Sequence, residues 1–217
     1  MKIAVVQFPG SNCDRDAVHV YRDVLGQEAQ LVWHRSDTLA GYDAVIVPGG
    51  FTYGDYLRAG ALARFAPVME EVRRFAARGG PVLGICNGFQ ILCEAGLLPG
   101  ALARNATLHF EGREVTLRCV GDGVWTQRVP RDRNLRIPIA HGEGRYVADE
   151  ATLDRLESEG RVAFRYDGTN PNGALRDIAG IYDEGRRVLG MMPHPERASE
   201  DLLGSIDGRS ILESVLQ

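Results

Sequence analysis

The residue of this sequence best placed for nucleophilic chemistry is a cysteine between two glycines. Residues 84–88 read Gly-Ile-Cys-Asn-Gly, the thiol form of the G-x-S-x-G turn that presents a nucleophile between a strand and a helix. Glycines two positions before and after Cys86 leave room for the sharp bend, and the helix that begins there favours the thiolate. The backbone N–H of Asn87 faces the same side. A buried cysteine in a plain turn is the alternative, so the motif needs a base beside it.

A histidine and a glutamate near the end of the chain supply that base. His194 stands between Pro193 and Pro195, which stiffen the backbone, and Glu196 is two residues on. Residues i and i+2 of an extended segment lie on one side, so the carboxylate can hold one ring nitrogen and leave the other for the thiol. We therefore predict a triad in which Cys86 is the nucleophile, His194 the base and Glu196 the group that orients the ring.

Acyl transfer by a thiol also needs N–H donors for the oxyanion. A Pro-Gly-Gly turn at residues 48–50 follows an apolar run, and the N–H of Gly50 is not obstructed by a side chain. Together with the N–H of Asn87 it would form the required pair. A plain turn is the alternative. The polar and aromatic loop 52–58 that follows is expected to border the same site.

The elements that must position these residues alternate along the chain. In the first half, apolar runs predict strands at 2–8, 28–33, 43–47 and 81–85, and amphipathic stretches predict helices at 13–25, 61–78 and 87–95. In the second half, strands are predicted at 113–120, 136–140, 161–167, 178–182 and 187–191, and helices at 150–159 and 208–216. This order predicts an α/β fold with an open, mainly parallel sheet, helices on both faces and an antiparallel extension. Active sites of such sheets lie at the carboxyl ends of the strands.

Length and composition set the remaining limits. The 217 residues predict one domain over 1–217, since a domain averages roughly 150 residues. A net charge of −4 disfavours binding to nucleic acid or anionic lipid. We find no apolar stretch near the ~20 residues of a membrane span and no secretory signal. The four cysteines form no C-x-x-C pair, which favours reduced thiols in the cytoplasm and no metal site.

Five strings of the sequence, taken with the triad, carry a family resemblance. They lie at residues 48–58, 84–90, 141–145, 170–173 and 190–197. Together they resemble the class I glutamine amidotransferases, and within them the glutaminase subunits of phosphoribosylformylglycinamidine synthase in purine biosynthesis. The resemblance spans nearly the whole chain. It departs from the expected pattern at Thr52 and Ala174, where a serine is expected.

The resemblance implies that the chain hydrolyses glutamine to glutamate and ammonia. The roles it implies are nucleophile for Cys86, base for His194, orienting group for Glu196, oxyanion donors for the N–H groups of Gly50 and Asn87, and a glutamine contact for Gln90. A free chain of this length is similar to the small type of subunit. That type works with a large synthetase subunit, which uses ATP and Mg²⁺, and with a small bridging subunit. No cofactor is expected in this chain, which shows no P-loop.

Three alternative functions differ from this one in residues that the sequence shows. A glutaminase of another pathway, such as one that feeds histidine or pyridoxal phosphate synthesis, would share the triad and differ in the strings at 48–58 and 141–145. A peptidase-like or chaperone-like relative with the same elbow would lack the His-Pro-Glu sequence that ends at Glu196. A scaffold without activity would have a broken triad, whereas this triad is intact.

The other cysteines and two histidines are weaker candidates. Cys13 is expected to cap or pack a helix start, Cys93 to lie in the core and Cys119 to lie in a strand. His109 is predicted in a strand. His141 lies in a glycine-rich loop that either contacts the synthetase or simply turns the chain.

Overall fold

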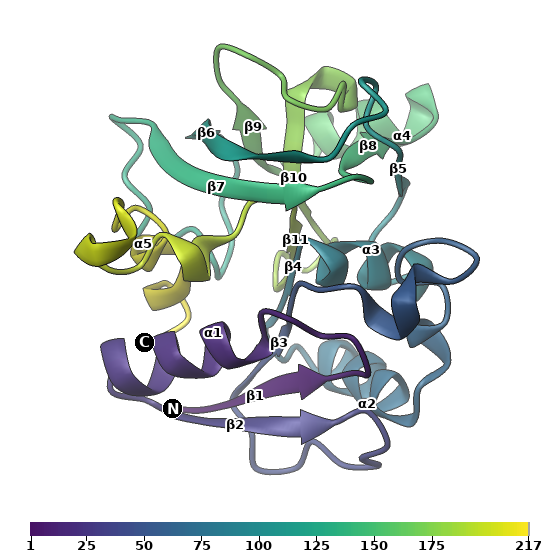
Figure 1. The fold of residues 1–217 in the computed structure, drawn as a ribbon, viewed down its shortest axis with the longest axis vertical. Coiled ribbons are helices and arrows are strands. Elements are labelled where there is room, and N and C mark those ends of the chain that lie inside the picture. The colour runs from purple at the N-terminus through teal and green to yellow at the C-terminus, as the bar shows by residue number, and fades with distance from the viewer. Residues whose placement is uncertain (217) are drawn as a thin grey trace.

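A nine-stranded mixed sheet runs through the protein, as the computed structural model shows for residues 1–216 (Figure 1). The order of its strands is β2-β1-β3-β4-β11-β10-β9-β6-β7. Their bounds are β1 Lys2–Gln7, β2 Glu28–Trp33, β3 Ala44–Val47, β4 Val82–Ile85, β6 Glu111–Cys119, β7 Leu135–His141, β9 Val162–Tyr166, β10 Ile178–Tyr182 and β11 Val188–Met191. The first five strands in this order are parallel to one another, and the pairs from β11 to β7 are antiparallel.

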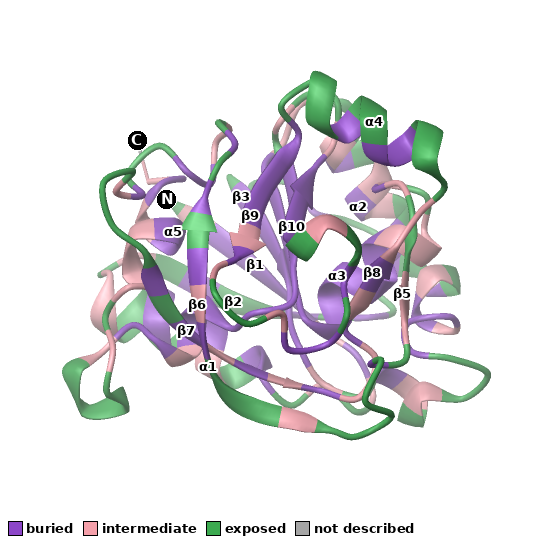
Figure 2. Ribbon diagram, turned by 90° about the horizontal axis from the view of Figure 1, so that it is seen from above, coloured by how far each residue is buried: buried purple, intermediate pink, exposed green. Residues whose placement is uncertain are grey.

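Helices flank this sheet, as the alternating sequence predicts. The helices are α1 Asp14–His19, which continues as a π-helix over Val20–Val24, α2 Pro67–Ala77, α3 Asn87–Glu94, α4 Glu150–Ser158 and α5 Arg209–Glu213. Helix α1 contacts β1 and β2, and α3 contacts β3, β4 and β11. The central strands β3, β4, β10 and β11 are buried along their whole length (Figure 2). None of the helices described is long and apolar enough to cross a membrane.

Strand β11 has a different place from the one expected of it. The sequence predicts the run at 187–191 as part of an antiparallel extension, but β11 lies in the middle of the sheet. It pairs in parallel with β4 and antiparallel with β10. The step from parallel to antiparallel pairing therefore occurs at β11, and the end of this strand lies beside the end of β4.

Three further predictions differ from the structure. The helix expected over 61–78 begins at Pro67, because the residue before a proline favours extended backbone, and Ala66 has φ −65° and ψ 142°. Phe65, an apolar residue within the predicted range, lies outside the helix and is 71% exposed. The closing helix is shorter than 208–216, and His109 precedes β6 in a bend rather than lying in a strand.

A small antiparallel sheet of β5 (Ala101–Ala103) and β8 (Arg145–Val147) was not predicted from the sequence. Both strands have three residues, too few for a period of two to stand out.

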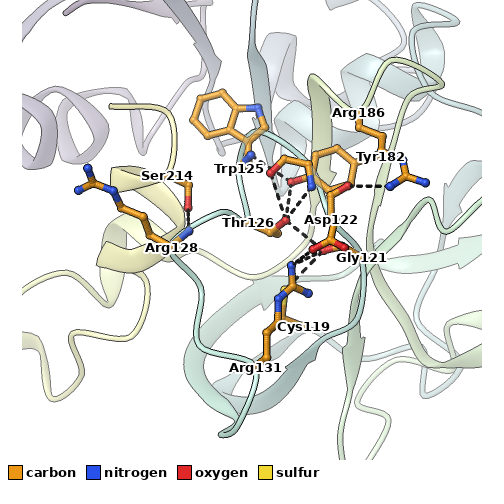
Figure 3. A network of polar contacts seen from close by, with 11 residues as sticks. Cys119, Gly121, Asp122, Trp125, Thr126, Arg128, Arg131, Tyr182, Arg186 and Ser214 are labelled. Carbon is orange, nitrogen blue, oxygen red and sulfur yellow. Dashed lines mark hydrogen bonds and ion pairs between the residues drawn. The ribbon is translucent and has the colours of Figure 1, made fainter. Parts of the chain in front are cut away.

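A network of polar contacts fixes the segment that follows β6 (Figure 3). The Tyr182 hydroxyl accepts a hydrogen bond from the backbone N–H of Trp125 at 3.1 Å and donates to Thr126 Oγ1 at 3.3 Å. The N–H of Arg128 donates to the hydroxyl of Ser214, just beyond α5.

The start of α3 packs directly on the end of β3, and this contact generates a prediction. A methyl group at Gly88 would lie 1.8 Å from the carbonyl oxygen of Val47, which is backbone and cannot move aside. We expect Gly88→Ala to lower the free energy of unfolding by about 2–3 kcal/mol, as overpacking does. Urea unfolding measures the loss. Gly142→Ala is the control, because a methyl group there meets nothing within 4 Å. Equal midpoints for Gly88→Ala and the unmodified chain would contradict the packing described.

Candidate active site

Cys86 occupies the sharp turn between β4 and α3, as predicted. Its backbone has φ 52° and ψ −107°, a combination that non-glycine residues rarely adopt. Such strain costs about 1–3 kcal/mol and persists only where the surroundings impose it. The N–H of Cys86 donates to the carbonyl oxygen of Met191 at 2.8 Å, which fixes the turn to the end of β11. A methyl group at Gly84 would lie 2.5 Å from Leu92 and 2.8 Å from the backbone of Gly88, so the bend requires its glycines.

His194 and Glu196 follow β11 and form a buried pair. The distance from His194 Nδ1 to Glu196 Oε1 is 2.6 Å, and the two residues are 1% and 2% exposed. The N–H of His194 donates to the carbonyl oxygen of Pro138 in β7, which holds the segment across the sheet. Within residues 1–216, neither His194 Nε2 nor Glu196 Oε2 has a hydrogen-bond partner. The carboxylate thus fixes the ring and leaves Nε2 free, as the spacing of the two residues predicts.

The thiol and the imidazole converge on the α-carbon of Gly49. A methyl group at Gly49 would lie 2.8 Å from His194 Cε1 and 3.5 Å from Cys86 Cβ. It would also lie 3.1 Å from Cys13 Sγ, so a second thiol reaches the same point. The structure therefore brings Cys86 and His194 together, as predicted, and it adds Cys13, which sequence analysis placed at a helix start. No spacing in the sequence signals that third contact.

The charges around His194 favour its protonated form. Burial lowers the pKa of this imidazole, but the charge of Glu196 and the nearby Cys86 and Cys13 thiols outweigh the burial, and the pKa lies well above its usual value. Neither thiol makes a hydrogen bond of good geometry with Nε2. A protonated imidazole between a carboxylate and a thiol is the arrangement that stabilises a thiolate nucleophile.

Gly50 and Asn87, the predicted oxyanion donors, both lie next to Cys86. Gly50 has φ +147°, and a methyl group there would lie 2.7 Å from the backbone nitrogen of Asn12, so only glycine fits. Asn87 is the first residue of α3, and its side chain is fully buried. Its Oδ1 accepts a hydrogen bond from the N–H of Thr52 at 3.2 Å. This bond ties the loop after Gly50 to the start of α3.

Two cavities meet at Cys86. One has a volume of about 160 Å³, and its lining includes Asp55, Gln90 and Glu143. The other has a volume of about 170 Å³ and is lined by Cys13, His194 and Arg197. Both also include Cys86 and Gly50. A larger cavity of about 470 Å³ lies between the end of α3 and α4, and its lining contains neither cysteine nor histidine, so it is not a candidate for thiol chemistry.

The 160 Å³ cavity carries two carboxylates in its lining, those of Asp55 and Glu143. Gln90 donates from Nε2 to the carbonyl oxygen of Glu143 at 2.6 Å and accepts from Asn87 at 2.8 Å. Burial, and after it the charge of Glu143, raise the pKa of Asp55 to about 6, although a hydrogen bond from Asn87 opposes both effects. The free protein therefore holds an unfavourable negative charge here. A ligand with a positive group next to its reactive part would relieve it.

A buried cluster of side chains supports the loop that carries Glu143. His141 donates from Nδ1 to Asn105 Oδ1 at 3.1 Å, and the same oxygen accepts from the N–H of Gly144 at 3.0 Å. Asn172 donates to the carbonyl oxygen of Gly144 at 2.8 Å. Burial and then the charge of His194 lower the pKa of His141 to about 4, so its ring is neutral near pH 7. His141 is 3% exposed, so it shapes the turn and does not itself offer a surface for contact.

The loop after Gly50 is held by a pair that sequence analysis missed. The distance from His34 Nδ1 to the hydroxyl oxygen of Tyr53 is 2.7 Å, and His34 is buried. Tyr53, Asp55 and Leu57 all have positive φ, a run that non-glycine residues adopt only where other contacts impose it. A histidine and a tyrosine at these unrelated positions give no signal in sequence.

Comparisons with known proteins place the chain in a family. Residues 1–211 match the CobB/CobQ-like glutamine amidotransferase domain. The phosphoribosylformylglycinamidine synthase subunit PurQ of Trichormus variabilis is 57% identical over 218 residues, which cover 100% of this chain and 97% of that protein. A chain in the structure of PurLQS from Thermotoga maritima has a TM-score of 0.90 and 44% identity, with 99% of this chain and 97% of that chain covered. A glutamine amidotransferase from Thermotoga maritima, at a TM-score of 0.58 and 18% identity over 99% of this chain and 90% of that one, shares the fold.

The four cysteines differ enough in surroundings to predict which one reacts with a substrate-like electrophile. Burial raises the pKa of Cys93, and it raises the pKa of Cys119 to about 11, so both stay protonated at pH 7.5. We expect a chloroketone analogue of glutamine to modify Cys86, with Cys93 and Cys119 unmodified, as peptide mass spectrometry after digestion would show.

The matched control is Cys86→Ser, which should lose the modification without transferring it to another cysteine. Modification of Cys93 or Cys119 in the unaltered chain, with Cys86 intact, would remove Cys86 from its proposed role.

Proposed function

Because this chain belongs to the CobB/CobQ-like glutamine amidotransferase family, we propose that it is the glutaminase subunit of a phosphoribosylformylglycinamidine synthase. The observation that carries the proposal is the convergence of Cys86 and the His194–Glu196 pair beside Gly49. A relative with 57% identity over the full chain, the PurQ subunit of Trichormus variabilis, supports the choice of reaction and pathway.

The first half of the proposed reaction forms a thioester. Cys86 gives its proton to Nε2 of His194, and the thiolate attacks the side-chain amide carbon of glutamine. The carbonyl electrons move onto the oxygen, where the backbone N–H groups of Gly50 and Asn87 stabilise the charge. His194 then returns the proton to the amide nitrogen. The C–N bond breaks, ammonia leaves, and a glutamyl group remains on the sulfur.

The second half releases glutamate. His194 takes a proton from a water molecule, and the resulting hydroxide attacks the thioester carbon. The same N–H pair holds the new oxyanion until the C–S bond breaks. Cys86 recovers its proton from His194, and the site returns to its starting state. Through both halves Glu196 keeps the ring oriented and balances the positive charge on it.

The 160 Å³ cavity is the proposed place for the glutamine substrate. It begins at Cys86 and contains Asp55 and Glu143, whose charges suit the α-ammonium group of an amino acid. Gln90 lines the same cavity and is positioned by its hydrogen bond to the Glu143 carbonyl oxygen. This arrangement explains why an acidic residue with a raised pKa is tolerated in the free protein.

The proposed partners follow from the names of the relatives. We infer that a large synthetase subunit binds ATP and Mg²⁺ and receives the ammonia, and that a small bridging subunit completes the complex. The support is the close similarity to a chain of PurLQS from Thermotoga maritima. A cytoplasmic location is proposed on the free state of all four cysteines in the structure.

The role of Glu196 gives a direct test of this function. Glu196→Gln keeps the shape and removes the charge, so the glutamine-dependent rate of the complex should fall on the order of 10³-fold, less than the loss from Cys86→Ala. The rate with added ammonia should not change, because that chemistry lies on the synthetase.

Both rates are measured in the reconstituted complex, with Glu184→Gln as the matched control, because the Glu184 side chain is 91% exposed. Loss of the ammonia-dependent rate in Glu196→Gln would show that the residue holds the interface or the fold. Its place in the triad would then have to be withdrawn.

The raised pKa of Asp55 predicts opposite effects on stability and on substrate binding. Between about pH 4 and pH 6 the folded chain binds more protons at Asp55 than the unfolded chain, so this group lowers the free energy of unfolding as the pH rises through that range. Asp55→Asn should therefore unfold at a higher urea concentration than the unmodified chain at pH 7.5, with a smaller difference at pH 4.5.

The same substitution should raise KM for glutamine about tenfold or more, because it removes a partner of the α-ammonium group. Asp132→Asn, at an exposed position, is the control for both measurements. An unchanged KM in Asp55→Asn would place the ammonium group elsewhere.

A further inference from the structure

Cys13 has surroundings that the proposed reaction does not use. It precedes α1 but makes no side-chain capping bond there, and it is 2% exposed. Its sulfur accepts a hydrogen bond from Nη2 of Arg197 at 3.0 Å. The Cys13 sulfur, a ring nitrogen of His194 and a carboxylate oxygen of Glu196 all lie within 4.8 Å of one another. A thiol is thus directed away from its own helix and toward the catalytic base.

The imidazole supplies an independent sign that a ligand fits at this point. His194 Nε2 is buried and has no hydrogen-bond partner among the described residues, while Nδ1 is taken by Glu196. The 170 Å³ cavity that His194 lines also has Cys13 and Cys86 in its wall. A histidine held by a carboxylate on one nitrogen, with the other nitrogen facing thiols, is the arrangement in which imidazoles bind zinc.

We propose that Cys13, Cys86 and His194 form a binding site for a thiophilic divalent cation such as Zn²⁺, and that the bound ion stops glutamine hydrolysis. Glu196 is the outer carboxylate that orients the imidazole. The inhibitory effect rests on the proposed function, because it follows from the loss of Cys86 and His194 to the ion. The binding itself does not depend on that function.

The types of the three ligand groups select the ion. Two thiolates and an imidazole suit Zn²⁺, whereas Mg²⁺ and Ca²⁺ require oxygen ligands. Tetrahedral zinc bonds of about 2.0–2.3 Å place ligand atoms roughly 3.3–3.8 Å apart. Cys13 and His194 already lie within 4.8 Å of each other. Cys86 lines the same cavity, and its side chain would rotate to bring the sulfur to the ion.

Protons and charge also balance at this site. Binding displaces the thiol protons of Cys13 and Cys86 to solvent and requires a neutral His194, so the affinity increases as the pH rises. The guanidinium of Arg197 stays as a donor to the Cys13 sulfur, which stabilises that thiolate. Because Cys86 cannot bind the ion and carry a glutamyl group at once, substrate turnover and ion binding exclude each other.

Cobalt substitution in the full-length chain tests the site without reference to activity. Co²⁺ bound by thiolates gives a charge-transfer absorption in the near ultraviolet. We expect a band of two-thiolate intensity for the unmodified chain, about half of it for Cys13→Ser and for Cys86→Ser, and full intensity for the control Cys93→Ser. Added Zn²⁺ should displace the cobalt and abolish the band. A one-thiolate band in the unmodified chain, or full intensity in Cys13→Ser, would overturn the site.

A second measurement needs no variant, so a folding defect in Cys13→Ser cannot confuse it. Alkylation of the unmodified chain with and without Zn²⁺, read by peptide mass spectrometry, should show protection of both Cys13 and Cys86 and none of Cys93. Protection of Cys86 alone would contradict the proposal.

Inhibition is tested on glutamate release, with each protein compared with its own rate in a chelator. Zn²⁺ should inhibit Cys13→Ser at concentrations at least tenfold higher than the unmodified chain, and the chelator should restore the rate. Equal inhibition of both proteins would overturn the role of Cys13. A chain that shows the two-thiolate band but never releases glutamate would instead refute the proposed function and leave the metal site standing.

Discussion

The site depends on one constraint, the adjacency of three parallel strands in the sheet. Strands β3, β4 and β11 are neighbours and run in the same direction, so the segments that follow them leave the sheet at the same edge. Those segments carry Gly49 and Gly50, then Cys86, then His194 with Glu196. The meeting of these segments at the α-carbon of Gly49 follows from this topology. The antiparallel part of the sheet also positions the site, because a carbonyl oxygen of β7 accepts the hydrogen bond from the backbone N–H of His194.

Reactivity at this edge is obtained at a cost in stability. Cys86 has strained backbone, and the partly buried charge of Asp55 is opposed by that of Glu143. Among residues 1–216, His194 Nε2 and Glu196 Oε2 are buried without hydrogen-bond partners. Each of these features weakens the folded state of the free chain. Substrate would satisfy several of them at once. The rest of the protein offsets them with fully buried central strands and with polar clusters such as Asn105, His141 and Asn172.

The residues that could be predicted from sequence are those whose roles depend on neighbours a few positions away. The glycines around Cys86 indicate a nucleophile turn, and the prolines around His194 indicate that Glu196 lies beside its ring. The alternation of strands and helices also predicted the fold class. In contrast, the central place of β11, the approach of Cys13 to His194 and the pair of His34 with Tyr53 depend on contacts between distant segments, which periodicity does not encode. The late start of α2 is an intermediate case. Pro67 is visible in the sequence and does set the start of the helix, but the apolar spacing on both sides of it predicted a longer helix.

The most direct test of the account is to observe its covalent intermediate. The reconstituted complex is mixed with glutamine, stopped in acid during steady turnover, digested and analysed by mass spectrometry. The account predicts one glutamyl group on the peptide that contains Cys86. The group should be absent in Cys86→Ser. It should be more abundant in Glu196→Gln, where hydrolysis of the thioester is slowed. Glutamate release with no glutamyl group on Cys86, or a glutamyl group on another cysteine, would contradict the central claim that this thiol at the edge of three parallel strands is the nucleophile.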